Sequence, residues 1–117
     1  MVTYEKLLKK SQVAHSLIGM SLAEFDELYA EFESAYDEKR SSLQKTRRQR
    51  RRRQRAVGAG RKYKYALRDR LLMSLFWLRA YMTYEVLGFF YDLNKTNIED
   101  NLKDVLAVLE SMSSLLL

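Results

Sequence analysis

The stretch that decides the fold is residues 67–98, LRDRLLMSLFWLRAYMTYEVLGFFYDLNKTNI. Apolar residues recur in it at intervals of three and four, which is the spacing of one face of an α-helix. A first helix is predicted to end near Ala80, Thr83 can cap a second, short helix, and Asn94 can cap a third. The apolar face of the first helix is supplied by Leu67, Leu71, Leu72, Leu75, Phe76 and Leu78.

Three helices with a short middle one and a tight turn at residues 92–94 fit a helix-turn-helix. In that geometry the exposed residues at the start of the last helix face base edges and flanking phosphates. Gly88 is expected to leave room for the close approach of a neighbouring helix. The candidate DNA-contacting residues of the last helix are Lys95, Thr96, Asn97 and Asn101.

The arginine-rich segment, residues 45–64, holds eleven bases and no acid. The rest of the chain has ten bases against 15 acids, a net charge of −5, so the positive charge is local. Guanidinium groups pair with phosphate oxygens two at a time, and we therefore expect this segment to bind a polyanion. Its candidate contact residues are Arg47, Arg48, Arg50, Arg51, Arg52, Arg53, Arg55, Arg61, Lys62 and Lys64.

So many like charges repel one another, so we expect this segment to be a frayed or disordered arm in the free protein. Gly58 and Gly60 predict a hinge near its end. Tyr63 and Tyr65, which alternate with lysines, either stack on bases or pack on the following helix. Arginine runs also act as solvated spacers or nuclear targeting signals, and the run alone does not distinguish DNA from RNA.

A leading helical region is predicted before the arginine-rich segment. Two short amphipathic stretches, residues 3–10 and 11–18, precede Gly19, which stops the second. Ser21 and Glu24 have the spacing of a reciprocal capping box, and the helix that follows is predicted to reach about residue 41 or to enter the arginine run. A core or helix-pairing face is predicted for its apolar stripe, Leu22, Phe25, Leu28, Tyr29, Phe32 and Tyr36.

The composition favours an all-α chain that can bury a core. There is no proline and only four glycines, while hydrophobic residues make up 47% of the sequence. We predict a helical bundle with a C-terminal three-helix helix-turn-helix unit and a basic linker. The predicted division is an N-terminal helical region at residues 1–44, the basic linker at 45–65 and the helix-turn-helix unit at 66–117.

Several kinds of site are excluded or disfavoured. The absence of cysteine excludes disulfides, thiolate zinc sites and cysteine nucleophiles, and His15, the only histidine, is expected to be a surface or packing residue. The first residues are not expected to form a secretory signal, and the sequence has no apolar run of about 20 residues. We expect a non-enzymatic, cytoplasmic, nucleoid-associated protein without cofactor, metal or membrane contact. Surface charges are predicted for Asp92, Glu99, Asp100 and Asp104.

Four stretches of the chain resemble the N-terminal helix-turn-helix of DDE-superfamily insertion-sequence transposases. They are GAGRK at residues 58–62, DRLLMSLFWLR at 69–79, TYEVLGFF at 83–90 and LNKTNI at 93–98. In that family a helical region and a basic linker precede the helix-turn-helix, which binds the terminal repeats of the element, and a metal-dependent nuclease domain follows. The resemblance implies a DNA-binding fragment that stops, after Glu110, before any catalytic domain.

The chain departs from the family pattern at two places. Glu99 and Asp100 stand where the family usually has a small residue and a base, and acids so close to phosphate oppose binding. Ala66 replaces the usual capping serine of the first helix of the motif, at a cost of about 1 kcal/mol.

The leading hypothesis is therefore the DNA-binding module of a truncated transposase, which binds duplex DNA, including transposon ends, through the arm and the last helix. One alternative is a non-specific RNA or polyanion-binding protein. Another is a helical interaction protein, or a homodimer, that pairs through the stripe at residues 22–36 or the stripe at residues 102–117.

Overall fold

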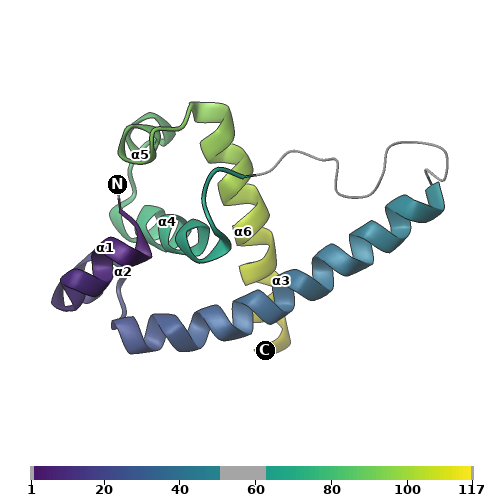
Figure 1. Ribbon diagram of the computed structural model, residues 1–117, viewed down its shortest axis with the longest axis horizontal. Helices are drawn as coiled ribbons and strands as arrows, with labels where there is room; N and C mark the ends of the chain where they lie inside the picture. Colours follow the sequence, from purple (N-terminus) through teal and green to yellow (C-terminus); the bar gives the residue numbers. More distant parts are fainter. Residues whose placement is uncertain (1, 51–62, 117) are drawn as a thin grey trace.

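The computed structural model describes residues 2–50 and 63–116, and the side chains of residues 2–41 and 63–112. Helix is the only regular secondary structure in these ranges, which confirms the all-α class (Figure 1). The elements are α1 (Tyr4–Lys9), a 3-10 turn η1 (Ser11–Val13), α2 (Ala14–Ile18), α3 (Leu22–Arg50), α4 (Leu67–Ala80), α5 (Tyr84–Tyr91) and α6 (Lys95–Leu116).

The boundaries of the N-terminal helices follow local signals in the sequence. Gly19 ends α2 in the left-handed conformation, with φ of 79°. Ser21 and Glu24 form the predicted capping box, in which each backbone amide donates to the side chain of the other residue at 3.1 Å. These hydrogen bonds satisfy amides at the start of α3 that have no carbonyl partner. They also hold the pKa of the Glu24 carboxyl below its usual range.

The helix-turn-helix caps were also predicted correctly. The hydroxyl of Thr83 accepts a hydrogen bond from the Val86 amide at 3.3 Å, and Asn94 Oδ1 accepts one from the Asn97 amide at 2.8 Å. Ala66 makes no side-chain cap at the start of α4. These caps fix where α5 and α6 begin, and therefore which residues of α6 lie next to the turn.

Gly88 permits a close approach of the α5–α6 turn and, as predicted, of a neighbouring helix, since Ile98 of α6 would lie 3.6 Å from a Cβ atom at this position. The Leu93 amide donates a hydrogen bond to the Gly88 carbonyl at 2.9 Å, and Asp92 ends α5 with φ of 52°. A Cβ atom added at Gly88 would lie 2.4 Å from the Leu93 carbonyl oxygen. The tight turn of the motif therefore requires glycine here.

We predict that Gly88→Ala lowers the free energy of unfolding by about 2–3 kcal/mol, because the new methyl group forces the turn backbone away. Urea unfolding followed by circular dichroism measures the change. Val86→Ala is the matched control, since its side chain is half exposed on the same helix and its loss costs less than about 1 kcal/mol. Equal stability of the Gly88→Ala protein and wild type would contradict the close approach.

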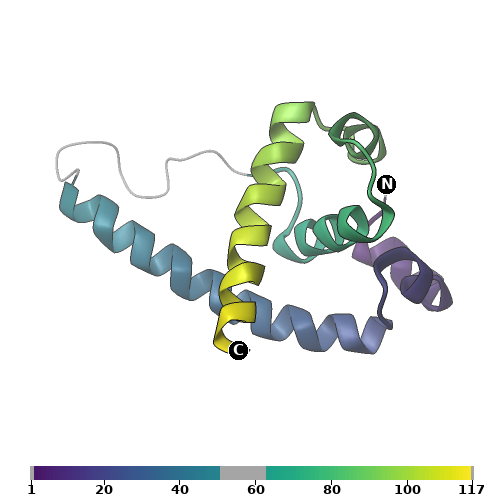
Figure 2. The ribbon, with the colours of Figure 1, turned by 180° about the vertical axis from the view of Figure 1, so that it is seen from behind.

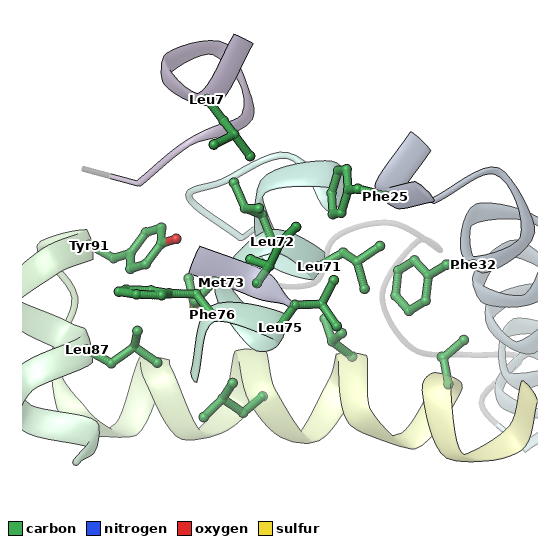
Figure 3. Close-up of a cluster of buried hydrophobic side chains, with 14 of the residues drawn as sticks. Leu7, Phe25, Phe32, Leu71, Leu72, Met73, Leu75, Phe76, Leu87 and Tyr91 are labelled. Atoms are coloured by element: carbon green, nitrogen blue, oxygen red, sulfur yellow. The ribbon is translucent and has the colours of Figure 1, made fainter. Parts of the chain in front are cut away.

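The core is centred on α4. Leu71, Leu72 and Met73 are fully buried in the middle of this helix. Figure 3 shows Phe25 and Phe32 of α3 on one side of the α4 side chains, and Leu87 and Tyr91 of α5 on the other. The helix is covered on several faces because α2, α3 and α6 all pack against it. Such burial explains why α4 has a broad apolar surface and not a single stripe.

The N-terminal helical region and the helix-turn-helix unit share this one core. Phe25, Phe32 and Tyr36, which form the buried part of the predicted stripe, belong to the same cluster as the apolar residues of α4 and α6. The predicted alternative in which this stripe pairs with another protein is therefore opposed, because the stripe is already covered inside the chain. The stripe of α6 is used in the same way from Leu102 to Met112, and the side chains of its last residues, 113–117, lie outside the described ones.

α3 continues as helix to Arg50, so it follows the predicted alternative in which this helix enters the arginine run. Residues 45–50 of the predicted arm are therefore helical, in spite of their like charges. In both views α3 extends beyond α6 and away from the other helices (Figure 2). The expectation of a frayed arm at residues 51–62 lies outside the described residues.

Candidate nucleic-acid interface

Residues 63–65, at the end of the arginine-rich segment and just beyond it, are anchored on the body of the protein. Lys64 Nζ donates to the backbone oxygen of Asp92 at 3.2 Å and lies 3.5 Å from a carboxylate oxygen of the same residue. The Tyr65 hydroxyl donates to the Tyr91 carbonyl, and the two rings meet edge to face at 5.5 Å. Tyr91 and Asp92 form the start of the α5–α6 turn, so the segment enters the body beside this turn.

Tyr63 adds a third contact. Its ring lies over the guanidinium of Arg70, 3.4 Å from the ring centroid, and burial raises the pKa of its hydroxyl. Tyr63 and Tyr65 therefore follow the predicted alternative in which they pack on the body. The contacts of Tyr63 and Tyr65 fix the place where the arginine-rich segment leaves the helix-turn-helix unit.

The start of α6 presents a small polar surface next to this anchor. Lys95 and Thr96 are exposed, while Asn97 is partly buried. Further along the helix, Lys103 is paired with Glu99 at 2.9 Å, and this carboxylate raises the pKa of the Lys103 ammonium. Asp100 is also exposed. The exposed face of α6 consequently carries little net positive charge of its own.

Asn101 is not part of this surface, which corrects its place among the predicted DNA contacts. It is 5% exposed, its Oδ1 accepts from Arg70 Nε at 2.8 Å, and its Nδ2 donates to the Asn97 carbonyl at 2.7 Å. Both ends of the amide are used inside the protein. Asn101 therefore holds the first turns of α6 in place and does not reach a base.

A buried polar cluster of Arg70, Asp104, Tyr36 and Asn101 joins three helices. Arg70 is 3% exposed, forms an ion pair with Asp104, and donates to the Tyr36 hydroxyl at 3.3 Å. That hydroxyl donates in turn to Asp104 Oδ2 at 2.6 Å. Within the described residues every buried side-chain nitrogen and oxygen has a hydrogen-bond partner. The cluster fixes α6 relative to α3 and α4.

Two residues of this cluster were missed by the sequence reasoning. Arg70 was not assigned a role, and Asp104 was expected to be a surface charge, whereas its side chain is 32% exposed and paired with a buried guanidinium. One signal was present, because Arg70 lies three residues after Leu67 and Asn101 lies three residues after Ile98. Both polar residues therefore fall on the core-facing stripes of their helices.

Arg68 fastens the N-terminal helices to α4. Its guanidinium carbon lies 4.5 Å from the ring centroid of Tyr4 and 4.6 Å from that of Tyr29. Burial, followed by a hydrogen bond to Glu33, raises the pKa of Tyr29 to about 12. A hydrogen bond to Asp26 raises the pKa of Tyr4.

The raised pKa values of Tyr4 and Tyr29 predict a loss of stability at alkaline pH. A tyrosine of the unfolded chain loses its proton near pH 10, whereas folded Tyr29 keeps its proton to about pH 12. The contribution of Tyr29 to the free energy of unfolding should therefore be constant below pH 10 and fall as the pH rises from about 10 to 12. Tyr29→Phe should make this fall shallower, as measured by urea unfolding at several pH values. An identical slope in wild type and Tyr29→Phe would contradict the assignment.

Three of the predicted arginine contacts lie on α3. Arg47, Arg48 and Arg50 belong to the helical backbone of α3. The following predicted contacts lie outside the described residues: Arg51, Arg52, Arg53, Arg55, Arg61 and Lys62.

The outer face of α5 is apolar and not basic. Phe89 is 85% exposed, and the half-exposed side chains of Val86 and Phe90 lie on the same short helix. Phe90 meets Phe89 and the buried Phe76 edge to face. Such a face does not suit phosphate, so a contact of α5 with a nucleic-acid backbone is disfavoured.

Metal sites and membrane spans are not found in the described parts of the chain. Residues 2–50 and 63–116 contain no group of three or more histidine or acidic side chains placed to hold a metal ion, and His15 is exposed. No helix in the same ranges has both the length and the apolar character needed to cross a membrane. Comparison of the chain with family models, curated proteins and solved structures gives no match.

Proposed function

We propose that this protein binds duplex DNA and that the arginine-rich segment and the start of α6 contact the same stretch of duplex. The observation that carries the proposal is the anchoring of Lys64 on Asp92, in the turn that leads into α6. Because the segment leaves the body beside this turn, phosphates bound by its arginines lie next to Lys95 and Thr96. The resemblance to insertion-sequence transposases supports transposon ends as the natural DNA target.

Affinity and sequence preference have different sources in this proposal. Lys64 is paired with Asp92, and the other ten bases of the arginine-rich segment neutralise phosphates, which gives salt-dependent binding without sequence preference. The first turn of α6 is the part that reaches base edges. It offers Lys95 and Thr96, and the neighbouring acids Glu99 and Asp100 limit what it can contribute.

Selection of binding sites from random duplexes at about 150 mM salt tests the proposal, because non-specific binding is weak at that ionic strength. We expect a preferred sequence for the wild type. The double variant Lys95→Ala and Thr96→Ala should lose that preference, because each base pair that a side chain reads contributes about 1–3 kcal/mol of discrimination. The matched control is Lys6→Ala and Lys9→Ala, which removes exposed charge from α1 and should leave the preference unchanged.

Two outcomes would count against the proposal. If structured RNA competes for the protein better than duplex DNA does, the RNA-binding alternative is favoured. If no duplex motif emerges and the α6 double variant behaves as wild type, α6 does not read bases and the chain is a general polyanion binder.

A protein-binding function is the second candidate, and the exposed aromatic face of α5 favours it. Phe89 is 85% exposed and lies beside the half-exposed Val86 and Phe90, and a group of exposed apolar side chains of this kind is typical of a protein-binding surface. This face lies on α5, so it can bind a protein while the start of α6 and the arginine-rich segment bind DNA.

A further inference from the structure

α3 consists of two blocks of opposite charge. Its first part, residues 22–38, has seven carboxylates and no base, and its second part, residues 39–50, has six bases and no acid. A helix dipole favours acids in the first turn and bases in the last turn only. The blocks of α3 run along the whole helix, so the dipole does not account for them. The acidic block comprises Glu24, Asp26, Glu27, Glu31, Glu33, Asp37 and Glu38, and the basic block comprises Lys39, Arg40, Lys45, Arg47, Arg48 and Arg50.

The acidic block forms an open helix face. All seven carboxylates are exposed, because the apolar residues of this part of α3 point into the core. Asp26 and Glu33 accept hydrogen bonds from the hydroxyls of Tyr4 and Tyr29, which leave their negative charge in place. No lysine or arginine among the described side chains forms an ion pair with any of the seven. Among the described residues this face therefore carries a net negative charge.

The basic block lies where a second molecule can reach it. Lys39 and Arg40, at its start, are exposed. Beyond them α3 extends past α6 and away from the other helices in both views (Figures 1 and 2). Each molecule thus offers an acidic helix face on its body and a projecting basic helix.

We propose that two copies of this chain pair through α3 in an antiparallel arrangement. The acidic block of each copy then lies against the basic block of the other, and the two-fold symmetry satisfies both pairs of blocks at once. The boundary between Glu38 and Lys39 falls near the two-fold axis, which puts Glu38 of one copy beside Lys39 of the second. A parallel pair would place acid against acid and base against base, which is repulsive.

The pairing depends on salt and competes with nucleic acid. Exposed ion pairs are individually weak, so the association requires many of them acting together at low ionic strength. The second part of the basic block belongs to the arginine-rich segment, so duplex DNA and a second copy compete for the same charges. Self-association is measured without nucleic acid, so its failure leaves the proposed DNA binding untouched.

Sedimentation velocity on the nuclease-treated full chain tests the pairing. We expect a dimer at about 50 mM salt, with an association constant that falls at least about tenfold at 500 mM salt. The acid-reversed variant carries Glu27→Lys, Glu31→Lys and Glu38→Lys, and the base-reversed variant carries Lys39→Glu, Arg40→Glu and Lys45→Glu. Each variant alone should be monomeric, and an equimolar mixture should form the dimer again. A monomeric wild type at about 100 µM and low salt, or an acid-reversed variant that dimerises as well as wild type, overturns the proposal.

Cross-linking tests the antiparallel direction, because the chain has no cysteine of its own. In this arrangement residue 31 of one copy lies opposite residue 46 of the second. A mixture of the Glu31→Cys and Thr46→Cys proteins should form a disulfide-linked dimer on mild oxidation, while each alone should not. A cross-link in the Glu31→Cys protein alone would indicate parallel pairing and overturn the antiparallel arrangement.

Discussion

Replacing the buried Arg70 by methionine is expected to lower the free energy of unfolding by about 3–5 kcal/mol. The substitution removes the ion pair with Asp104 and leaves the Asn101 Oδ1 and the Tyr36 hydroxyl with fewer partners. Leaving buried polar groups without partners costs more than the pair itself contributes. Since small domains are stable by only about 5–15 kcal/mol, the variant should be close to unfolding at room temperature. Urea unfolding followed by circular dichroism and tryptophan fluorescence measures the loss.

Arg68→Met is the matched control, because it replaces an exposed arginine two positions away on the same helix. Among the described side chains its guanidinium lies over the rings of Tyr4 and Tyr29, so the expected loss is about 1–2 kcal/mol. The double variant Arg70→Met and Asp104→Leu should recover part of the stability, because an apolar pair replaces a buried ion pair at small cost. A single Arg70→Met variant no less stable than Arg68→Met would contradict the role of the cluster.

Neutralising four arginines of the arginine-rich segment is expected to weaken binding to every duplex by about 10²–10³-fold near 150 mM salt. The variant carries Arg51→Gln, Arg52→Gln, Arg53→Gln and Arg55→Gln. Each phosphate contact releases bound counterions, so the slope of log K against log salt should become shallower by about 3–4. Fluorescence anisotropy with a labelled duplex, repeated over a range of salt concentrations, gives both quantities.

The control removes the same charge from the body of the protein. Lys6→Gln, Lys9→Gln, Lys10→Gln and Arg79→Gln are all at exposed positions outside the segment. This variant should keep the wild-type slope and lose less than about tenfold in affinity, because distant exposed charges are screened. If both variants lose affinity equally, binding depends on net charge alone, and the location of the bases in the arginine-rich segment does not matter.

Much of the fold could be predicted because its signals are local. Ser21 and Glu24, three residues apart, specify the start of α3, and Thr83 and Asn94 specify the starts of α5 and α6. These hydrogen bonds link residues within one turn, so the spacing in the sequence is sufficient to find them. The helical period of the apolar residues likewise identified the core faces of α3 and α6.

The polar part of the site could not be predicted from the same signals. Arg70 is 31 residues from Asn101 and 34 residues from both Tyr36 and Asp104, so only the packing of three helices brings them together. The prediction for Asn101 failed for this reason, since its position near the start of α6 suggested a DNA contact. Its amide is instead needed to pair the buried guanidinium. The anchoring of Lys64 on Asp92 is also long-range and was not foreseen.

The burial of α4 between the N-terminal helices and α6 has a practical consequence for anyone who wants to transplant this helix-turn-helix. A fragment that begins at residue 66 would lack Phe25 and Phe32, which pack in the same core as Leu71. It would therefore expose apolar side chains of α4 and be prone to aggregation. A chimera that keeps the fold of α4, α5 and α6 must therefore also carry the first forty residues, which complete the core around α4.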